Sequence, residues 1–173
     1  APAQERKELV EFLEAHLGVK IDVRGFLSVT PNERKSIYTN ISYAFNDKFD
    51  EVTIKLRSGI MWSDGVPFTA KDVVYTMNML KANAPALGNW SVNAKTWVKD
   101  IAAVDDQTVK ITLTSANPRF ILDTFGVRIY GVTFILPEHI WKDKDPMTFS
   151  NFDLSKGWPV STSPYGLVAS NST

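Results

Sequence analysis

Residues 51–74 read EVTIKLRSGIMWSDGVPFTAKDVV, and the pattern of side chains changes twice along them. At the start, apolar side chains occupy every second position, which places Val52, Ile54 and Leu56 on one face of an extended chain. Polar side chains occupy the alternate positions. This alternation is typical of a strand that covers a core with one face and meets water with the other. The pattern therefore predicts a half-buried strand over residues 51–57.

A tight turn and a helix are predicted after this strand. The segment 63–67, SDGVP, consists mainly of residues that favour turns. Thr69 and Asp72 stand three residues apart, which is the spacing of an acidic capping box. In that motif two side chains satisfy backbone N–H groups that the first helical turn leaves without partners. Val73 and Met77 then follow at helical spacing. We therefore expect a helix that begins at Thr69 and contributes Val73 to the core.

The same reasoning predicts further elements on both sides of this stretch. Helices are expected at 5–17 and 117–125, strands at 19–23, 38–45, 97–104, 108–113 and 128–136, a helix with Pro137 in its first turn, and a loop or single turn at 28–36. The strands at 97–104 and 108–113 should form a hairpin. A strand at 163–168 would have no partner downstream, so we expect the chain to be part of a longer polypeptide. The mixture predicts a mixed α/β (α+β) fold.

The composition argues against several classes of protein. Lys and Arg number 19 together, as do Asp and Glu, so the formal net charge is zero. A balanced chain lacks the positive field that a nucleic-acid binder uses, and we expect no nucleic-acid partner. The chain has no cysteine, which removes disulfides, thiolate metal sites and a cysteine nucleophile. No run of about 18 apolar residues is present, so no membrane span is expected.

The sequence does not contain a catalytic or metal-binding pattern. The two histidines are His16 and His139. They lie far apart, without carboxylates at ligand spacing, so a metal site is not expected. The paired carboxylates are Asp105 with Asp106 and Asp143 with Asp145. Both pairs fall in predicted turns, where Asp bonds to the backbone. Neither a Gly-x-Ser-x-Gly motif nor a phosphate-binding glycine loop occurs. We therefore predict no catalytic residue, no metal ligand and no cofactor.

Aromatic residues in predicted loops are the remaining signal for function. Trp90 lies in a stretch rich in Gly, Asn and Ser, and Trp158 lies beside Gly157 and Pro159. A flat ring on a loop can stack on a sugar or a peptide, because it offers a large contact area with few rotors. The alternative is that each ring fills a small core beneath its loop. Trp62 and Trp97 adjoin strands and are expected in the core.

Four segments resemble the family 5 extracellular solute-binding proteins, the receptor subunits of ABC importers. They are residues 52–74, 109–120, 135–141 and 161–167. The first resembles the family signature of a strand, an Asp-Gly-x-Pro turn and a Thr-x-x-Asp-Val helix start. In the last, Ser161 and Ser163 stand where the family usually has glycine. The resemblance implies a fragment of the first lobe of a two-lobe periplasmic-binding-protein-like fold. Residues 38–173 would hold part of lobe I with its extra subdomain, residues 1–37 a divergent N-terminal segment, and the second lobe would be absent.

The resemblance also implies a function and a site. The expected function is non-catalytic capture of a peptide or an oligosaccharide for ABC permease subunits, in the periplasm or outside the cell, with a lipid anchor on the full-length protein. The cleft residues implied at matching places are Asn89, Trp90, Arg128 and Tyr130. Trp90 would stack on the cargo, and Arg128 would donate a fork of hydrogen bonds. The alternatives are a secreted carbohydrate-active hydrolase and a protein-binding scaffold module.

Overall fold

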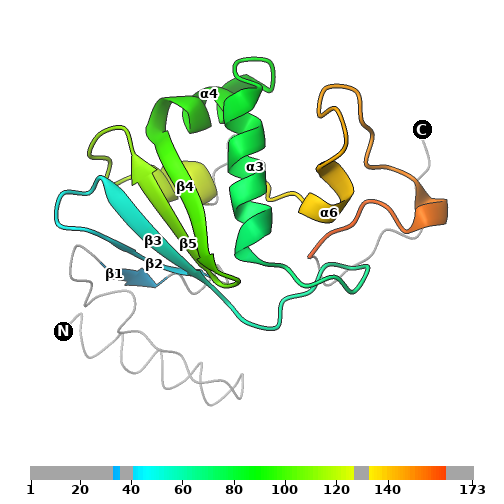
Figure 1. Cartoon of the computed structure of the whole chain (residues 1–173), viewed down its shortest axis with the longest axis horizontal. Coiled ribbons are helices and arrows are strands. Elements are labelled where there is room, and N and C mark those ends of the chain that lie inside the picture. The colour runs from blue at the N-terminus through cyan, green and yellow to red at the C-terminus, as the bar shows by residue number, and fades with distance from the viewer. Residues whose placement is uncertain (1–32, 36–40, 127–132, 163–173) are drawn as a thin grey trace, which may run out of the picture.

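A five-stranded antiparallel sheet forms the centre of the part of the chain that the structure describes. The computed structural model describes residues 33–35, 41–126 and 133–162. The strands are β1 (Glu33–Lys35), β2 (Ile41–Phe45), β3 (Glu51–Leu56), β4 (Val98–Asp105) and β5 (Thr108–Leu113). Their order across the sheet is β1-β2-β3-β5-β4, and every neighbouring pair is antiparallel (Figure 1).

One face of this sheet carries the core. Val52 pairs with Ile111, and Ile54 pairs with Val109; all four side chains are buried. The intervening residues of β3 and β5 are half-buried or exposed. On that outer face Lys110 Nζ lies 3.0 Å from Glu51 Oε2. The alternation predicted for residues 51–57 is therefore confirmed, and its cause is a sheet that is covered on one side.

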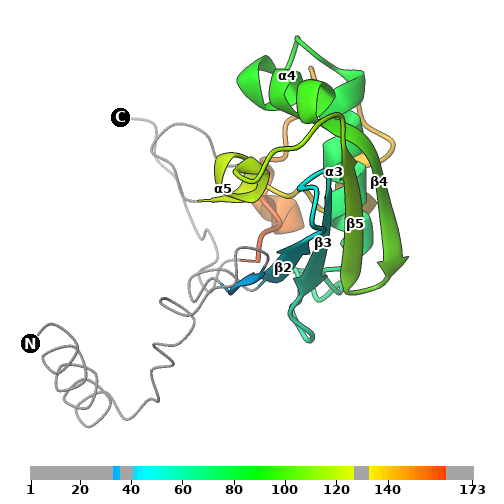
Figure 2. The same ribbon diagram turned by 90° about the vertical axis from the view of Figure 1, so that its left-hand side faces the viewer.

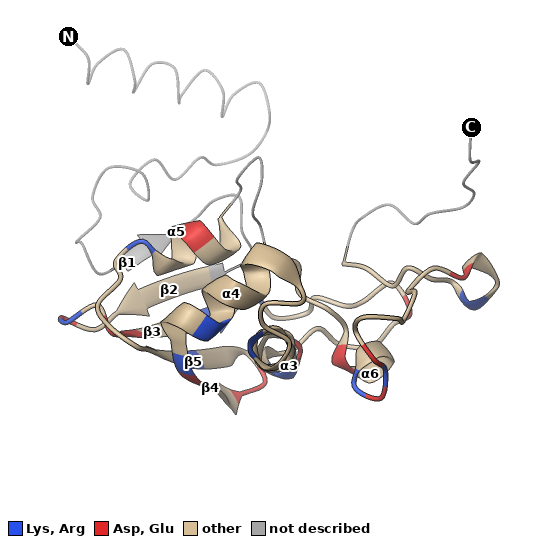
Figure 3. Ribbon diagram, turned by 90° about the horizontal axis from the view of Figure 1, so that it is seen from above, with Lys and Arg blue, Asp and Glu red and all other residues tan. Residues whose placement is uncertain are grey.

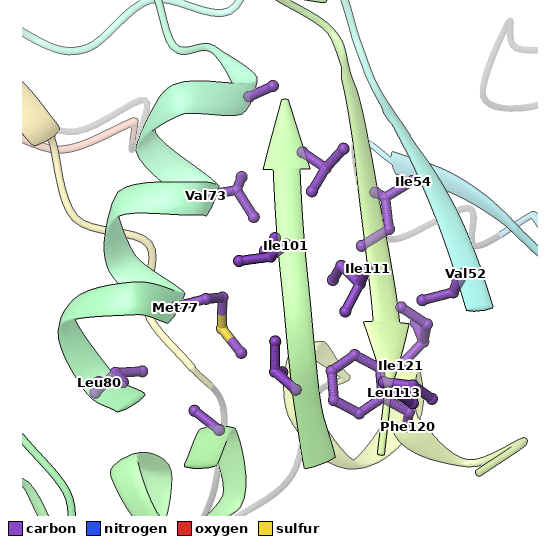
Figure 4. Close-up of a cluster of buried hydrophobic side chains, with 14 of the residues drawn as sticks. Val52, Ile54, Val73, Met77, Leu80, Ile101, Ile111, Leu113, Phe120 and Ile121 are labelled. Carbon is purple, nitrogen blue, oxygen red and sulfur yellow. The ribbon is translucent and has the colours of Figure 1, made fainter. Parts of the chain in front are cut away.

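Three helices supply the other half of the core. They are α3 (Ala70–Ala82), α4 (Gly88–Trp97) and α5 (Phe120–Phe125). Val73 and Met77 of α3 face Ile101 of β4, and Phe120 of α5 lies beside Leu113 of β5 (Figure 4). These side chains belong to one buried cluster. Figure 2 shows α4 at one end of β4 and β5, where it closes that end of the layer.

The chain after residue 133 packs beside α3. It contains the short helix α6 (Glu138–Trp141), close to α3 in Figure 1, and the 3-10 turn η1 (Leu154–Lys156). The ring of Phe149 lies between two indoles, with centroid distances of 4.8 Å to Trp141 and 5.6 Å to Trp158. Both contacts are edge-on, a preferred aromatic geometry. This aromatic cluster holds the segment together outside the main core.

Acidic and basic residues are interspersed in the described part of the chain (Figure 3). The loop that follows α6 carries Lys142, Asp143, Lys144 and Asp145 in succession. Mixed charge of this kind agrees with the zero net charge of the sequence.

Most elements match the sequence-based expectations. The strand at 51–57, the hairpin of 97–104 with 108–113 and the helix after Thr69 are confirmed. The helix predicted at 117–125 is confirmed in its second half, as α5. Pro137 precedes α6 as its N-cap residue and does not stand inside its first turn.

Two expectations were wrong. Residues 28–36 were expected as a loop or turn, yet residues 33–35 form β1, because they complete backbone hydrogen bonds at the edge of β2. Residues 128–136 were expected as a strand, yet 133–136 have no regular structure, because they run along α3 instead of joining the sheet. The elements predicted at 5–17, 19–23 and 163–168 lie outside the described residues.

Candidate ligand pocket

The first turn of α3 is built as the sequence predicts. The hydroxyl of Thr69 accepts a hydrogen bond from the Lys71 N–H, and the Thr69 N–H donates to Asp72 Oδ2 over 2.8 Å. The full capping box is present. The neighbouring Asp-Gly turn is closed by a bond from the Gly65 N–H to the Trp62 carbonyl, and Gly65 has a φ of 84°, which an L side chain rarely adopts. The signature residues at this point therefore form a structural corner.

Asp72 and Thr76 also hold a distant part of the chain. The other carboxylate oxygen of Asp72, Oδ1, accepts the Glu138 N–H over 2.9 Å. Thr76 Oγ1 donates to the Asp72 carbonyl over 2.8 Å and accepts the Leu136 N–H over 2.9 Å. Farther back, the Thr133 N–H donates to the Thr124 carbonyl of α5 over 3.0 Å. The segment 133–138 is therefore fastened to two helices at three points.

An apolar cavity of about 200 Å³ lies between this segment and the helices. Its walls come from α3, the first residues of α4, the segment 133–136 and the region around α6. The lining residues are Thr76, Met79, Leu80, Leu87, Trp90, Thr133, Phe134, Leu136, Trp141 and Pro146. None of these ten residues is charged. Trp90 and Phe134 remain 44% and 71% exposed, so their rings form the rim of the cavity.

The chemistry of these walls favours an uncharged group. Thr76 is 1% exposed, and its hydroxyl is already engaged as donor and as acceptor. The walls therefore offer few polar atoms to a ligand, and the transfer of an apolar group from water supplies the free energy of binding. A charged or heavily hydroxylated group would lose most of its hydration bonds, because the walls offer few partners, among them the buried Trp141 Nε1, which has no hydrogen-bond partner among the described residues. The site can hold one apolar side chain, with aromatic rings at the entrance.

The structure brings one of the four predicted site residues to this cavity. Trp90 lines it, whereas Asn89 is exposed and is absent from the walls. The expectation that both lie in a loop was wrong, because they stand in the first turn of α4. Gly, Asn and Ser have low helix propensity, but Ala94 and Ser91 are buried, and this packing overrides it. Arg128 and Tyr130 lie outside the described residues.

The other tryptophans have structural roles. Trp62 is 4% exposed and packs edge-on against Phe68, at a centroid distance of 5.4 Å, as expected for a core residue. Trp97 is half-buried against the main core. Trp158 packs on Phe149, and Lys156 Nζ lies 5.0 Å from its ring centroid. For Trp158 this packing agrees with the alternative of a small core under a loop.

Sequence reasoning predicted only Trp90 among the ten lining residues, and the nine that it missed include Thr76, Phe134 and Trp141. Thr76 lies on the apolar face of α3 and carried no motif, while Phe134 stood within a run that looked like a strand. Trp141 belongs to the segment 135–141, whose resemblance to the family was noted without a role for the ring. The available signal was a run of bulky residues followed by Pro137. Phe134 and Trp141 lie near α3 because of contacts between residues about sixty positions apart, and local sequence patterns do not contain such contacts.

Asp105, Asp64 and His139 make contacts that stabilise turns of the described chain. Asp105 Oδ1 accepts the Gln107 N–H over 2.8 Å, and this bond, with others, lowers the pKa of the Asp105 carboxyl. His139 Nε2 lies 2.8 Å from Asp64 Oδ2, which joins α6 to the Asp-Gly turn. Burial raises the pKa of Asp64, but the His139 hydrogen bond and a backbone N–H outweigh it, and the net pKa lies below the usual value.

Within the ranges given above, no group of three or more His, Cys, Asp or Glu side chains is placed to hold a metal ion. The helices in the same ranges include none that is long and apolar enough to cross a membrane.

Comparison with known proteins identifies the family. The model of the bacterial extracellular solute-binding proteins, family 5 Middle, matches residues 42–172. The chain belongs to this family. A probable peptide-binding protein of Agrobacterium fabrum is 28% identical over 129 residues, which are 73% of this chain and 19% of that protein. A glutathione-binding protein of Shigella flexneri serotype 5b is 30% identical over 133 residues, which are 76% of this chain and 23% of that protein.

Solved structures of related proteins share the fold. NikZ from Campylobacter jejuni, in complex with Ni(L-His), is 26% identical with a TM-score of 0.57, covering 72% of this chain and 23% of that one. The ABC transporter substrate-binding protein CtaP from Listeria monocytogenes is 31% identical with a TM-score of 0.57, covering 77% and 26%. The mixed α/β fold is thus that of a segment of such binding proteins. The chain spans about a fifth to a quarter of the length of its curated relatives.

Proposed function

We propose that this chain is part of the solute-binding component of an ABC importer, and that it takes peptides or peptide-like solutes. In this proposal residues 38–173 contribute part of the first lobe, residues 1–37 form a separate N-terminal segment, and the cargo is held against a second lobe. Capture takes place in the periplasm or outside the cell, and the loaded receptor docks on permease subunits. The role is binding without catalysis.

The observation that carries this proposal is the apolar cavity beside Trp90. It combines uncharged walls with two exposed rings at the rim, which suits an apolar side chain of a peptide. The relatives named as binding a peptide or glutathione support the same class of cargo. An oligosaccharide would need many hydrogen-bond partners, and the cavity walls offer few. Among the proposed contacts Trp90 stacks on the cargo, while Asn89, Arg128 and Tyr130 supply polar contacts around it.

Binding follows from differential affinity for two states of the receptor. A cargo that fills the cavity and also touches the opposite lobe binds the closed state more tightly than the open state, so it shifts the population toward closure. Permease subunits can then recognise the closed form. The part of this mechanism that belongs to the described residues is the cavity and its rim.

Calorimetric titration of tripeptides tests the proposal, using the protein expressed from its complete reading frame. Substitution Trp90→Ala should weaken binding of a tripeptide with an apolar side chain by about 1–3 kcal/mol, the cost of losing a well-packed aromatic anchor. The matched control is Val92→Ala, because Val92 is also 44% exposed on α4 but does not line the cavity. Equal affinities of the two variants, or tight binding of oligosaccharides with none of peptides, would contradict the proposal.

A further inference from the structure

We propose that Asp72 and Thr76 are positioning residues for specificity: by fastening the segment 133–138 to α3, they set the size of the apolar group that the cavity accepts. This inference deepens the proposed function and rests on it for the identity of the cargo. The two residues are 4% and 1% exposed. Their bonds to the segment run to Glu138 and Leu136 respectively.

The two fastening points match in register. Asp72 and Thr76 are four residues apart on a helix, which corresponds to about 6 Å along the axis. Leu136 and Glu138 are two residues apart in a chain that is extended at Pro137, where φ is −67° and ψ is 111°. Two extended residues span roughly 6.6 Å. The segment therefore lies along α3 with alternate N–H groups facing it, and Pro137, which stands between them, has no N–H to satisfy.

Thr76 both holds the segment 133–138 through its hydroxyl and lines the cavity itself. Thr76 lines the cavity, and so do Leu136 and Thr133 from the segment that it holds. If the Leu136 N–H loses its acceptor, this part-buried donor is left unsatisfied, which favours a shift of the segment toward water or another acceptor. That shift moves one wall while α3 stays fixed against the sheet. The width of the cavity therefore depends on the hydrogen bonds and not only on the sizes of the lining side chains.

The segment 133–138 is held separately at its first residue, Thr133, by α5. The Thr133 N–H bonds to the Thr124 carbonyl, and the Asn93 amide donates to Thr124 Oγ1 over 3.2 Å. Thr124 is 1% exposed. With this end held by α5, a change at Thr76 or Asp72 pivots the segment instead of releasing it. A change in the size preference of the cavity is thus expected, with the sheet intact.

The test uses n-alkylbenzenes, from benzene to butylbenzene, as probes of cavity size. A cavity of about 150 Å³ with apolar walls is known to bind benzene, so this series is suited to a site of this volume. With the wild-type protein, affinity should rise about fourfold for each methylene that fits, the fold-change equivalent of one buried CH2. It should then stop rising once the cavity is full. Binding is measured by calorimetry, and folding by circular dichroism.

Thr76→Val keeps the shape of the side chain but removes the hydroxyl, and it should move the chain length at which affinity stops rising. Thr76→Ser keeps the hydroxyl but removes a methyl group from the wall, so its profile should shift by no more than that one group. Glu138→Pro removes the other bond, from the Glu138 N–H to Asp72, and remains informative if Thr76→Val does not fold. Glu138 is the first residue of α6, a position where proline is tolerated. Glu138→Ala is the matched control because it keeps the N–H.

The outcomes separate the two proposals. A changed size profile in Glu138→Pro, with the wild-type profile kept in Glu138→Ala, supports the positioning role whether or not tripeptides bind, because Glu138 does not line the cavity. Identical profiles in all variants, or no binding of any alkylbenzene by the wild type, would overturn it. Failure of tripeptides to bind, alongside a shifted alkylbenzene profile, would count against the proposed function alone.

Discussion

Replacing Asp72 by Ala is expected to destabilise the fold by about 3 kcal/mol. The carboxylate is 4% exposed and accepts two backbone N–H groups, one from Thr69 and one from Glu138. Loss of a helix-capping side chain costs about 1 kcal/mol. Loss of the second bond, which the part-buried Glu138 N–H donates to the carboxylate, costs about 2 kcal/mol more, because a hydrogen bond to a charged acceptor is lost.

Substitution by Asn separates the two contributions. An amide keeps one oxygen in place of two, so its NH2 group must face one of the two backbone donors. Asp72→Asn should therefore lose roughly half as much as Asp72→Ala, about 1.5 kcal/mol on the same reasoning. The control is Asp100→Asn, because Asp100 is exposed on β4 and surface substitutions stay within about 0.5 kcal/mol.

Urea-induced unfolding, followed by tryptophan fluorescence, measures these differences. The free energy of unfolding should fall in the order wild type, Asp72→Asn, Asp72→Ala, with an unchanged dependence on urea concentration. A loss of less than about 1 kcal/mol for Asp72→Ala would show that the two N–H groups find other acceptors and that the corner is not fixed by this side chain.

Two further predictions concern the core and the response to acid. Ile111→Ala should lower the free energy of unfolding in urea by about 2–5 kcal/mol, because removal of this fully buried side chain leaves a cavity. The control Val104→Ala, at a residue that is 62% exposed on the edge strand, should lower it by less than about 0.5 kcal/mol. Similar losses in the two variants would refute the assigned core face. Burial raises the pKa of Asp64, but the His139 contact and the Val66 N–H together outweigh burial, so the pKa is lower in the folded protein and the folded state binds this proton less tightly. The stability that ionised Asp64 contributes is complete above the ordinary carboxyl pKa of about 3.9 and is lost as the pH falls through the lower folded value. The gap in unfolding free energy between wild type and Asp64→Asn should therefore shrink below about pH 4, and a gap that stays constant would contradict the stabilising contact of Asp64 with His139.

Local signals predicted the centre of the fold. The alternation in residues 51–57 and the capping residues Thr69 and Asp72 act within a few residues of sequence, so the strand and the helix start could be found without coordinates. The hairpin turn after Asp105 is local in the same sense. Strand β1 could not be found this way, because its three residues are polar and owe their conformation to the edge of β2.

The candidate site was predictable only in part. Trp90 stood out because no periodic apolar face accounted for it, and it does line the cavity. The assignment of its surroundings to a loop failed, since burial of Ala94 and Ser91 outweighs the low helix propensity of residues 88–91. Phe134 and Thr76 could not be linked from the sequence, because the hydrogen bond that brings their segments together joins residues sixty positions apart.

The separation of the bonded partners along the chain has a consequence for the order of folding. The hairpin of β4 and β5 closes between Asp105 and Thr108, whereas Thr76 meets Leu136 across sixty residues and Asp72 meets Glu138 across sixty-six. Closing a flexible loop of sixty residues costs roughly 2 kcal/mol more chain entropy than closing one of four. Contacts between distant segments also form late when local ones are available. The hairpin can therefore assemble early, while the cavity forms only when the segment 133–138 has docked on α3.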